Sequence, residues 1–90
     1  MWKRIWKYEL DTRGINEVKM PIGAEILALQ TQFEKPCLWV LVDETQAFET
    51  RLFHIFGTGQ AINMDIEKER KYIGTYQLQG GNLVFHLFEY

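Results

Sequence analysis

Several residue types and patterns are missing or scarce in this chain. It contains no serine, which excludes a serine nucleophile, and its one cysteine, Cys37, cannot form an internal disulfide. No apolar run approaches the ~20 residues that a membrane-spanning helix needs. The N-terminal residues 1–6 lack the apolar core of a signal peptide. We therefore expect a protein without disulfides or membrane spans that acts in a reducing cytoplasm.

Aromatic residues, by contrast, are plentiful. Three Trp, four Tyr and six Phe occur in 90 residues, which is generous for one small domain spanning 1–90. The net charge of −2 provides no global attraction to nucleic acid or to an anionic membrane. Composition therefore predicts a folded domain and argues against nucleic-acid and membrane partners.

Short segments with strand patterns follow one another along the chain. Alternation of apolar and polar residues predicts strands at 6–10 and 18–20, and apolar runs predict strands at 37–42 and 48–56. Residues 24–30 also suit a helix by composition, but they lack an N-cap and are few, so we favour a strand. The polar stretch 63–71 is expected to be an exposed loop with at most one helical turn.

The last part of the chain predicts a β-hairpin. Strands at 72–78 and 83–90 flank Gln79-Gly80-Gly81-Asn82, whose glycines tolerate the positive φ of a tight turn. The final strand is apolar on both faces, so either a second layer or a second copy of the chain must cover it twice. We expect an all-β antiparallel sandwich or small barrel of about six to seven strands, forming a homo-oligomer through one face of this strand, made of Val84, His86, Phe88 and Tyr90.

Two segments invite a binding interpretation. The glycines of 57–60 let a ligand approach the backbone, although no helix clearly follows them as in phosphate-binding loops, and a plain turn also explains them. Residues 2–8 interleave basic and aromatic side chains, which suits single-stranded nucleic acid. The same alternation is typical of a half-buried edge strand, which the acidic charge balance favours.

Metal binding and catalysis have little support in the sequence. Cys37, His54 and His86 lie on separate predicted strands without the local ligand pairs of zinc sites. Carboxylates cluster only at 65–69, where solvent would surround them. We therefore expect no metal, no cofactor and no enzymatic activity.

Several motifs together resemble a small family of bacteriophage and prophage proteins. They are Ile5-Trp6-Lys7-Tyr8, residues 20–24, Pro36 to Asp43, Gly57-Thr58-Gly59, residues 72–75 and the ending 83–89. The resemblance covers nearly the whole chain and comes with no assigned chemistry. It implies a phage accessory protein that acts in the cytoplasm of a bacterial host.

Such accessory proteins suggest a binding function. We expect the chain to sequester a small nucleotide-like ligand, such as a host immune signal, in a homo-oligomer. Rings would stack on the ligand, backbone N–H groups would meet it, and a guanidinium would bind its phosphate. The predicted ligand residues are Trp39, Arg51, Phe56, Gly57, Thr58, Gly59, Gln60 and Tyr76. The alternatives are a module that blocks a host protein through a sheet edge or apolar patch, and a virion structural or assembly protein.

Overall fold

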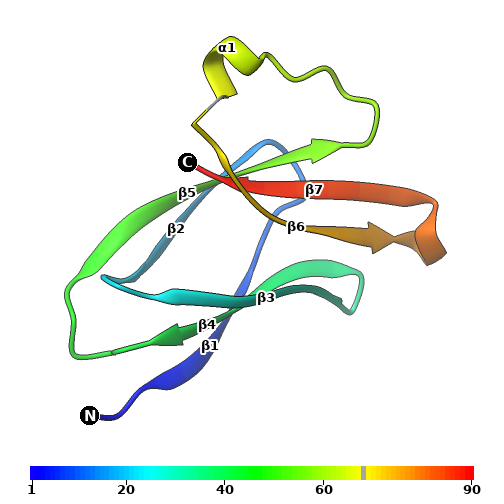
Figure 1. Ribbon diagram of the computed structural model, residues 1–90. Coiled ribbons are helices and arrows are strands. Elements are labelled where there is room, and N and C mark those ends of the chain that lie inside the picture. The colour runs from blue at the N-terminus through cyan, green and yellow to red at the C-terminus, as the bar shows by residue number, and fades with distance from the viewer. Residues whose placement is uncertain (68) are drawn as a thin grey trace.

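The computed structural model describes residues 1–67 and 69–90. Its strands form two antiparallel sheets that lie in two layers (Figure 1). Sheet A has the strand order β1-β4-β3, and sheet B has the order β2-β5-β7-β6. The predicted all-β antiparallel class is therefore confirmed.

The elements follow the predicted sequence of strands with shifted ends. They are β1 Arg4–Glu9, β2 Ile15–Pro21, β3 Glu25–Gln32, β4 Lys35–Val42, β5 Phe48–Gly57, α1 Met64–Glu67, β6 Lys71–Leu78, a 3-10 turn Gln79–Gly81 and β7 Leu83–Glu89. The ambiguous segment 24–30 thus belongs to a strand, and β2 is longer than predicted. In the described part of the chain, no helix is long and apolar enough to cross a membrane.

Two tight turns close the two hairpins of neighbouring strands. Gly80 and Gly81 have φ of 65° and 97°, as predicted for the β6–β7 turn. The β3–β4 turn consists of Phe33 and Glu34, with φ of 51° and 61°. The strand predicted at 37–42 therefore begins two residues earlier, because β4 starts at Lys35. The carboxylate of Glu34 accepts a hydrogen bond of 2.9 Å from the Gln79 N–H, which links the two turns.

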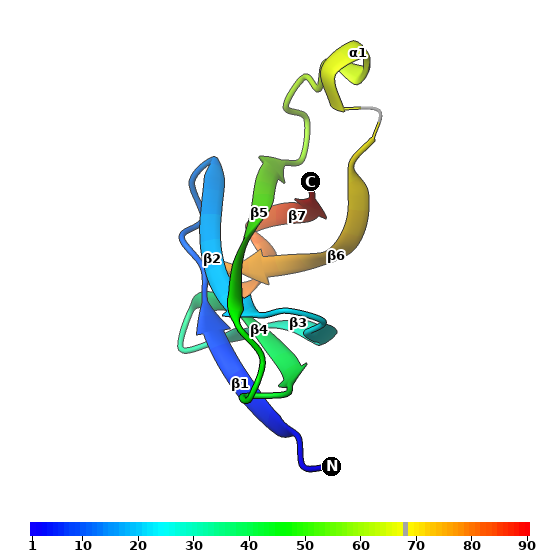
Figure 2. The same ribbon diagram turned by 90° about the vertical axis from the view of Figure 1, so that its left-hand side faces the viewer.

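The core lies between the facing sides of the two sheets. Strand alternation directs Leu38, Val40 and Val42 from sheet A into it, and Phe53 and Leu87 from sheet B, all with no exposed surface. Figure 2 shows β2 beside β5, with β1 and β4 below them. Sheet A therefore covers one face of β7, the strand that is apolar on both faces. For this face, the cover is the second layer that was one of the two expected alternatives.

The two sheets meet along one side of the sandwich. There, edge strand β3 of sheet A lies against edge strand β6 of sheet B. The Thr31 hydroxyl donates a hydrogen bond of 3.0 Å to the carbonyl of Gln77. A Cβ on Gly74 would lie 3.3 Å from a methyl carbon of Leu29, so a glycine permits this close approach. On the other side, β1 and β2 are open edges.

One buried hydroxyl leads to a stability prediction. The Tyr8 ring packs against the core, and its buried hydroxyl has no hydrogen-bond partner in the described part of the chain. Burial raises the pKa of this phenol. Because Tyr8→Phe removes an unsatisfied polar group and keeps the ring, we expect it to raise the free energy of unfolding by about 1 kcal/mol. Thermal unfolding measures this change, and a lower midpoint for the variant would contradict it.

Candidate functional site

The side of sheet B that points away from sheet A carries a cluster of aromatic and polar side chains, including the four predicted interface residues. Neighbouring strands β5, β7 and β6 place aromatic, histidine and threonine side chains there by alternation and register. We call this surface the aromatic face. It consists of His54, Phe56, Tyr72, Thr75, Val84, His86, Phe88 and Tyr90.

Rings on the aromatic face contact one another across the three strands. The centroids of Phe56 and Phe88 are 5.7 Å apart at 81°, and those of Tyr72 and Phe88 are 5.5 Å apart at 63°. The His54 ring lies 4.0 Å from that of Phe56. The two spacings around Phe88 are within the range of favourable edge-to-face pairs, so the rings form one continuous apolar floor.

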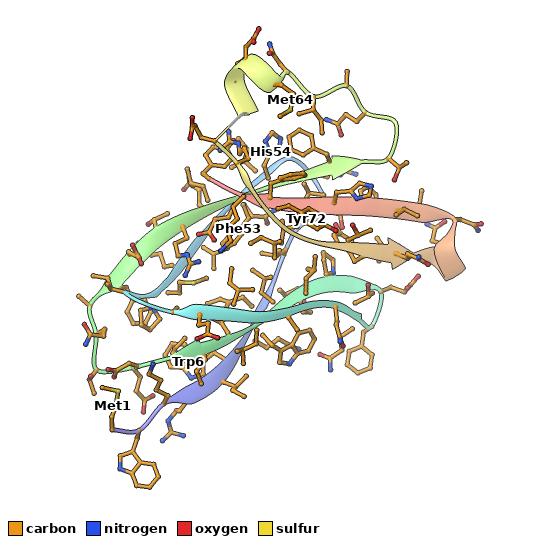
Figure 3. All side chains as sticks on the ribbon, in the orientation of Figure 1. Met1, Trp6, Phe53, His54, Met64 and Tyr72 are labelled. Atoms are coloured by element: carbon orange, nitrogen blue, oxygen red, sulfur yellow. The ribbon has the colours of Figure 1, made fainter. Side chains whose placement is uncertain are left out.

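The connection from β5 to β6 passes over this floor. In Figure 3, Met64 and His54 lie on the side of sheet B that carries α1, whereas Phe53 points the other way, towards sheet A. Ile62 and Met64 of the connection, with Phe56, Phe88 and Arg70, enclose a hollow of about 120 Å³. Ile62 and Met64 keep 37% and 61% of their surface exposed, so this cover is partial.

Arg70 lies at the boundary of two adjacent hollows. It lines the apolar hollow just described and also a second hollow of about 210 Å³, which Ile66, Glu69 and Tyr90 complete. Its guanidinium lies over the Tyr90 ring in a cation–π contact. A ligand that occupied both hollows would therefore have to pass this cation.

A chain of hydrogen bonds runs across the aromatic face through His86. The Thr58 hydroxyl lies 2.7 Å from His86 Nε2, and the Thr75 hydroxyl lies 3.0 Å from Nδ1. Tyr72 bonds to Thr75 at the far end. The chain joins β6, β7 and the start of the overlying connection, so His86 holds Thr58 to the sheet.

The carbonyl of Val84 sets the direction of this chain. The Thr58 hydroxyl donates to that carbonyl at 3.1 Å, because a carbonyl oxygen only accepts. His86 Nε2 must therefore carry the proton that Thr58 Oγ1 accepts. In the neutral ring Nδ1 is then the acceptor for Thr75, whose oxygen accepts from Tyr72. Both ring nitrogens are satisfied within the chain.

The predicted glycine loop satisfies most of its own backbone donors. The Gly57 N–H donates to the Gln60 side chain at 3.0 Å, and the Thr58 N–H donates to the Val84 carbonyl at 3.1 Å. The Gln60 N–H donates to the Gly57 carbonyl at 3.1 Å. Gly59 has φ of 88°, which suits glycine at a turn. The geometry is that of a self-contained turn, and Gly57 and Thr58 also line an open hollow beside the β6–β7 turn.

The eight predicted ligand residues do not converge on one site. Phe56, Gly57 and Thr58 lie together at the end of β5, next to Gly59 and Gln60. Trp39 belongs to sheet A, on the side opposite the core residues Leu38 and Val40. Arg51 and Tyr76 point between the sheets, which separates them from Phe56.

Tyr76 is a core residue. It is 3% exposed, and its ring stacks on Phe85 with a centroid distance of 5.5 Å. Its hydroxyl donates to Thr12 at 3.2 Å. Burial raises the pKa of Tyr76, and the Thr12 hydrogen bond opposes this rise. The ring therefore has no free face for a ligand in this arrangement.

Arg51 is engaged in an ion pair with Glu89. Its Nε and Nη2 donate to the two carboxylate oxygens at 2.6 and 2.8 Å, and Nη1 donates to the carbonyl of Ala24 at 2.7 Å. The side chains are 18% and 14% exposed. The pKa of Arg51 is raised, first by the hydrogen bonds to Glu89. The guanidinium thus ties β5 to β7 and to the start of β3, at the bottom of a hollow of about 400 Å³ between β3 and β6.

The four predicted interface residues all belong to the aromatic face. Val84, His86 and Phe88 are half-buried, and Tyr90 is 43% exposed. Part of their cover comes from the connection within the same chain, through Thr58 and Arg70. The second face of β7 is therefore partly covered without a second copy.

Metal-ligand chemistry has no geometric basis in the described residues. No three His, Cys, Asp or Glu side chains among them lie close enough together to hold a metal ion. Cys37 is buried in sheet A, whereas His54 and His86 lie on the outer side of sheet B.

Comparison with known proteins adds a family. A family model described as a domain of unknown function, DUF7352, matches residues 1–90. The chain belongs to the DUF7352 family. No curated protein and no solved structure matches it.

Sequence reasoning did not identify some of the residues that form this site in the DUF7352 chain. Ile62, just before the predicted exposed loop 63–71, alternates with Met64 and Ile66 inside it, and this alternation was the available signal for a cover. Tyr72 and Thr75 share a face although they are three residues apart, because a bulge between Tyr72 and Gly74 shifts the register. Period-two reasoning alone would have separated them.

Proposed function

We propose that the protein is a non-enzymatic binding protein for a small nucleotide-like ligand, held between the aromatic face and the β5–β6 connection. The observation that carries the proposal is the hollow of about 120 Å³ between Phe56 and Phe88 below and Ile62 and Met64 above, with Arg70 at its boundary. Apolar walls beside a cation match a flat ring that bears an anionic group.

The sizes of the hollows support this ligand class. An apolar cavity of roughly 150 Å³ can hold benzene, so the first hollow, at about 120 Å³, would take a base-sized ring only if its partial cover of Ile62 and Met64 moves outwards. The remainder of the ligand would lie past Arg70, in the hollow of about 210 Å³ formed with Glu69 and Tyr90. Stacking of a base on an aromatic side chain contributes about 1–3 kcal/mol per base.

The His86 chain supports binding in preference to catalysis. Both nitrogens of the ring bond to threonine hydroxyls, and the chain ends on a backbone carbonyl. In this arrangement His86 positions Thr58 and with it the start of the cover. Phage origin and action in the bacterial host cytoplasm belong to the proposal as well, and the ligand would then be a host signalling nucleotide.

A calorimetric titration with the four ribonucleoside 5′-monophosphates tests the binding site. We expect one of them to bind, and Phe88→Ala to weaken it at least tenfold because one wall of the hollow is lost. Arg70→Gln should weaken the nucleotide more than its nucleoside, since only the nucleotide has a phosphate. Phe33→Ala is the control, because Phe33 is 87% exposed in a distant turn. Absence of binding by all four, or normal binding by Phe88→Ala, would contradict the proposal.

A second candidate function is capture of another protein at an open sheet edge. The observation that favours it is β1, which is unpaired on one side and is preceded by Trp2, 93% exposed, with Ile5 on the strand 60% exposed. An extended segment could add a strand there. If none of the four nucleotides binds in the titration, the result would favour this second function.

A further inference from the structure

Strand β2 presents unpaired backbone groups along its free edge. In Figure 2, β5 lies on one side of β2, and on the other side runs only the connection that leads from β1 to β2, which is not a strand. The carbonyl of Gly14 accepts from Ile55, and the Ile22 N–H donates to Ala47, so even-numbered residues of β2 bond to β5. The N–H and C=O groups of Ile15, Glu17 and Lys19 therefore point outwards.

Strand β2 also carries two opposite charges next to its outward-pointing N–H and C=O groups. Glu17 and Lys19 are two residues apart, so their side chains share one side of the strand, and both are exposed. In the described part of the chain, no hydrogen bond or ion pair engages either side chain. The edge thus combines free backbone donors and acceptors with one free anion and one free cation.

We propose that this edge pairs with β2 of a second copy of the chain, antiparallel and with Val18 on the two-fold axis. In an antiparallel ladder, the N–H and C=O groups of every second residue point towards the neighbouring strand. Two copies of β2 can therefore pair only in registers where odd-numbered residues of one copy face odd-numbered residues of the other. With Val18 on the axis, Glu17 faces Lys19 of the partner subunit. By symmetry, Lys19 faces Glu17 of the partner subunit. A shift by one position along the edge would place Glu17 opposite Glu17 of the partner subunit, or the two Lys19 side chains opposite each other.

Further groups at the ends of the strand suit this register. Ile15, 53% exposed, would lie opposite Pro21 of the partner subunit, which is buried in its own chain and has no N–H to donate, so the ladder ends there beside Ile22, 49% exposed. Apolar contacts would then flank the charged centre on both sides. Pairing would join two four-stranded sheets into one continuous sheet and remove an exposed edge.

The other open edge, β1, is less suited to a second copy. It also alternates opposite charges, Lys7 and Glu9, but these are used within the chain. Lys7 donates to Gln32 at 2.8 Å, and Glu9 lies 3.2 Å from Lys35. Self-pairing through β1 would have to compete with these contacts, whereas pairing through β2 breaks none.

A charge-swap experiment tests the β2 dimer. Sedimentation equilibrium of the wild type should give twice the chain mass of 10.7 kDa. Glu17→Lys and Lys19→Glu should each weaken association at least tenfold, because each places like charges opposite one another twice. The double variant Glu17→Lys/Lys19→Glu should restore it. Lys7→Glu, on the other open edge, should leave the dimer unchanged.

Three results would overturn the proposal. They are a wild type that is monomeric throughout, single variants that associate normally, and a double variant that associates no better than the singles. Circular dichroism checks that each variant is folded. We expect folded variants because both substituted positions are exposed. Nucleotide titration of the monomeric variants separates this inference from the proposed function, because the aromatic face is built within one chain.

Discussion

Replacing Arg51 by methionine should lower the free energy of unfolding by about 3 kcal/mol, because the carboxylate of Glu89 stays behind without its partner. That carboxylate is 14% exposed, and it receives two hydrogen bonds from Arg51. The carbonyl of Ala24 loses its donor as well. Urea unfolding followed by tryptophan fluorescence measures the change, through the denaturant midpoint at constant slope.

A double variant provides the matched control for this prediction. Arg51→Met/Glu89→Leu removes both charges and should recover most of the loss, since a buried ion pair is often replaceable by apolar groups. The experiment also decides between two roles of Arg51. An Arg51→Met protein that is as stable as the wild type but no longer binds nucleotide would contradict the structural role and favour the phosphate contact predicted from the sequence.

Phe53→Ala should have a larger effect, about 4 kcal/mol. Phe53 is fully buried in the centre of β5, opposite Asn16 on β2 and Glu89 on β7, so truncation opens a cavity between the two sheets. Many domains of this size have only 5–15 kcal/mol to lose, so part of the population would unfold on mild heating. Calorimetric unfolding with the same buffer for both proteins measures the shift.

Phe33→Ala is the matched control, because it makes the same substitution at an exposed position. Phe33 is 87% exposed in the β3–β4 turn, so the same truncation removes few contacts and should change stability by no more than about 0.5 kcal/mol. Equal losses for the two phenylalanines would contradict the placement of Phe53 at the centre of the core.

Local patterns were sufficient to predict the strands. Alternation in 6–10 and the apolar runs at 37–42 and 48–56 led to β1, β4 and β5, and Gly80-Gly81 led to the last turn. The two faces of β7 were also correctly separated, since Leu87 is buried and His86 lies on the aromatic face. These features depend on residues that are neighbours in the chain, which is why a single sequence shows them.

Features that depend on distant residues could not be predicted in this way. Nothing near Arg51 indicates that Glu89 will lie beside it, 38 positions later. Trp39 and Phe56 looked equivalent as stacking residues, yet the sheet assignment of their strands places them in different layers. The turn at Phe33 and Glu34 has positive φ without a glycine or asparagine, so local rules predicted a connection there but not its backbone conformation.

The strand order has a consequence for how the chain folds. Among the described residues, only β3–β4 and β6–β7 join strands that are adjacent in sequence through a tight turn. The remaining pairings connect distant residues, such as Arg4 with Val42 and Ile15 with His54. Loop closure must precede these contacts, so folding should take milliseconds to seconds, typical of sandwiches rich in non-local pairs. The two hairpins would form first, and β1 and β2 would stay unpaired until β4 and β5 are in place.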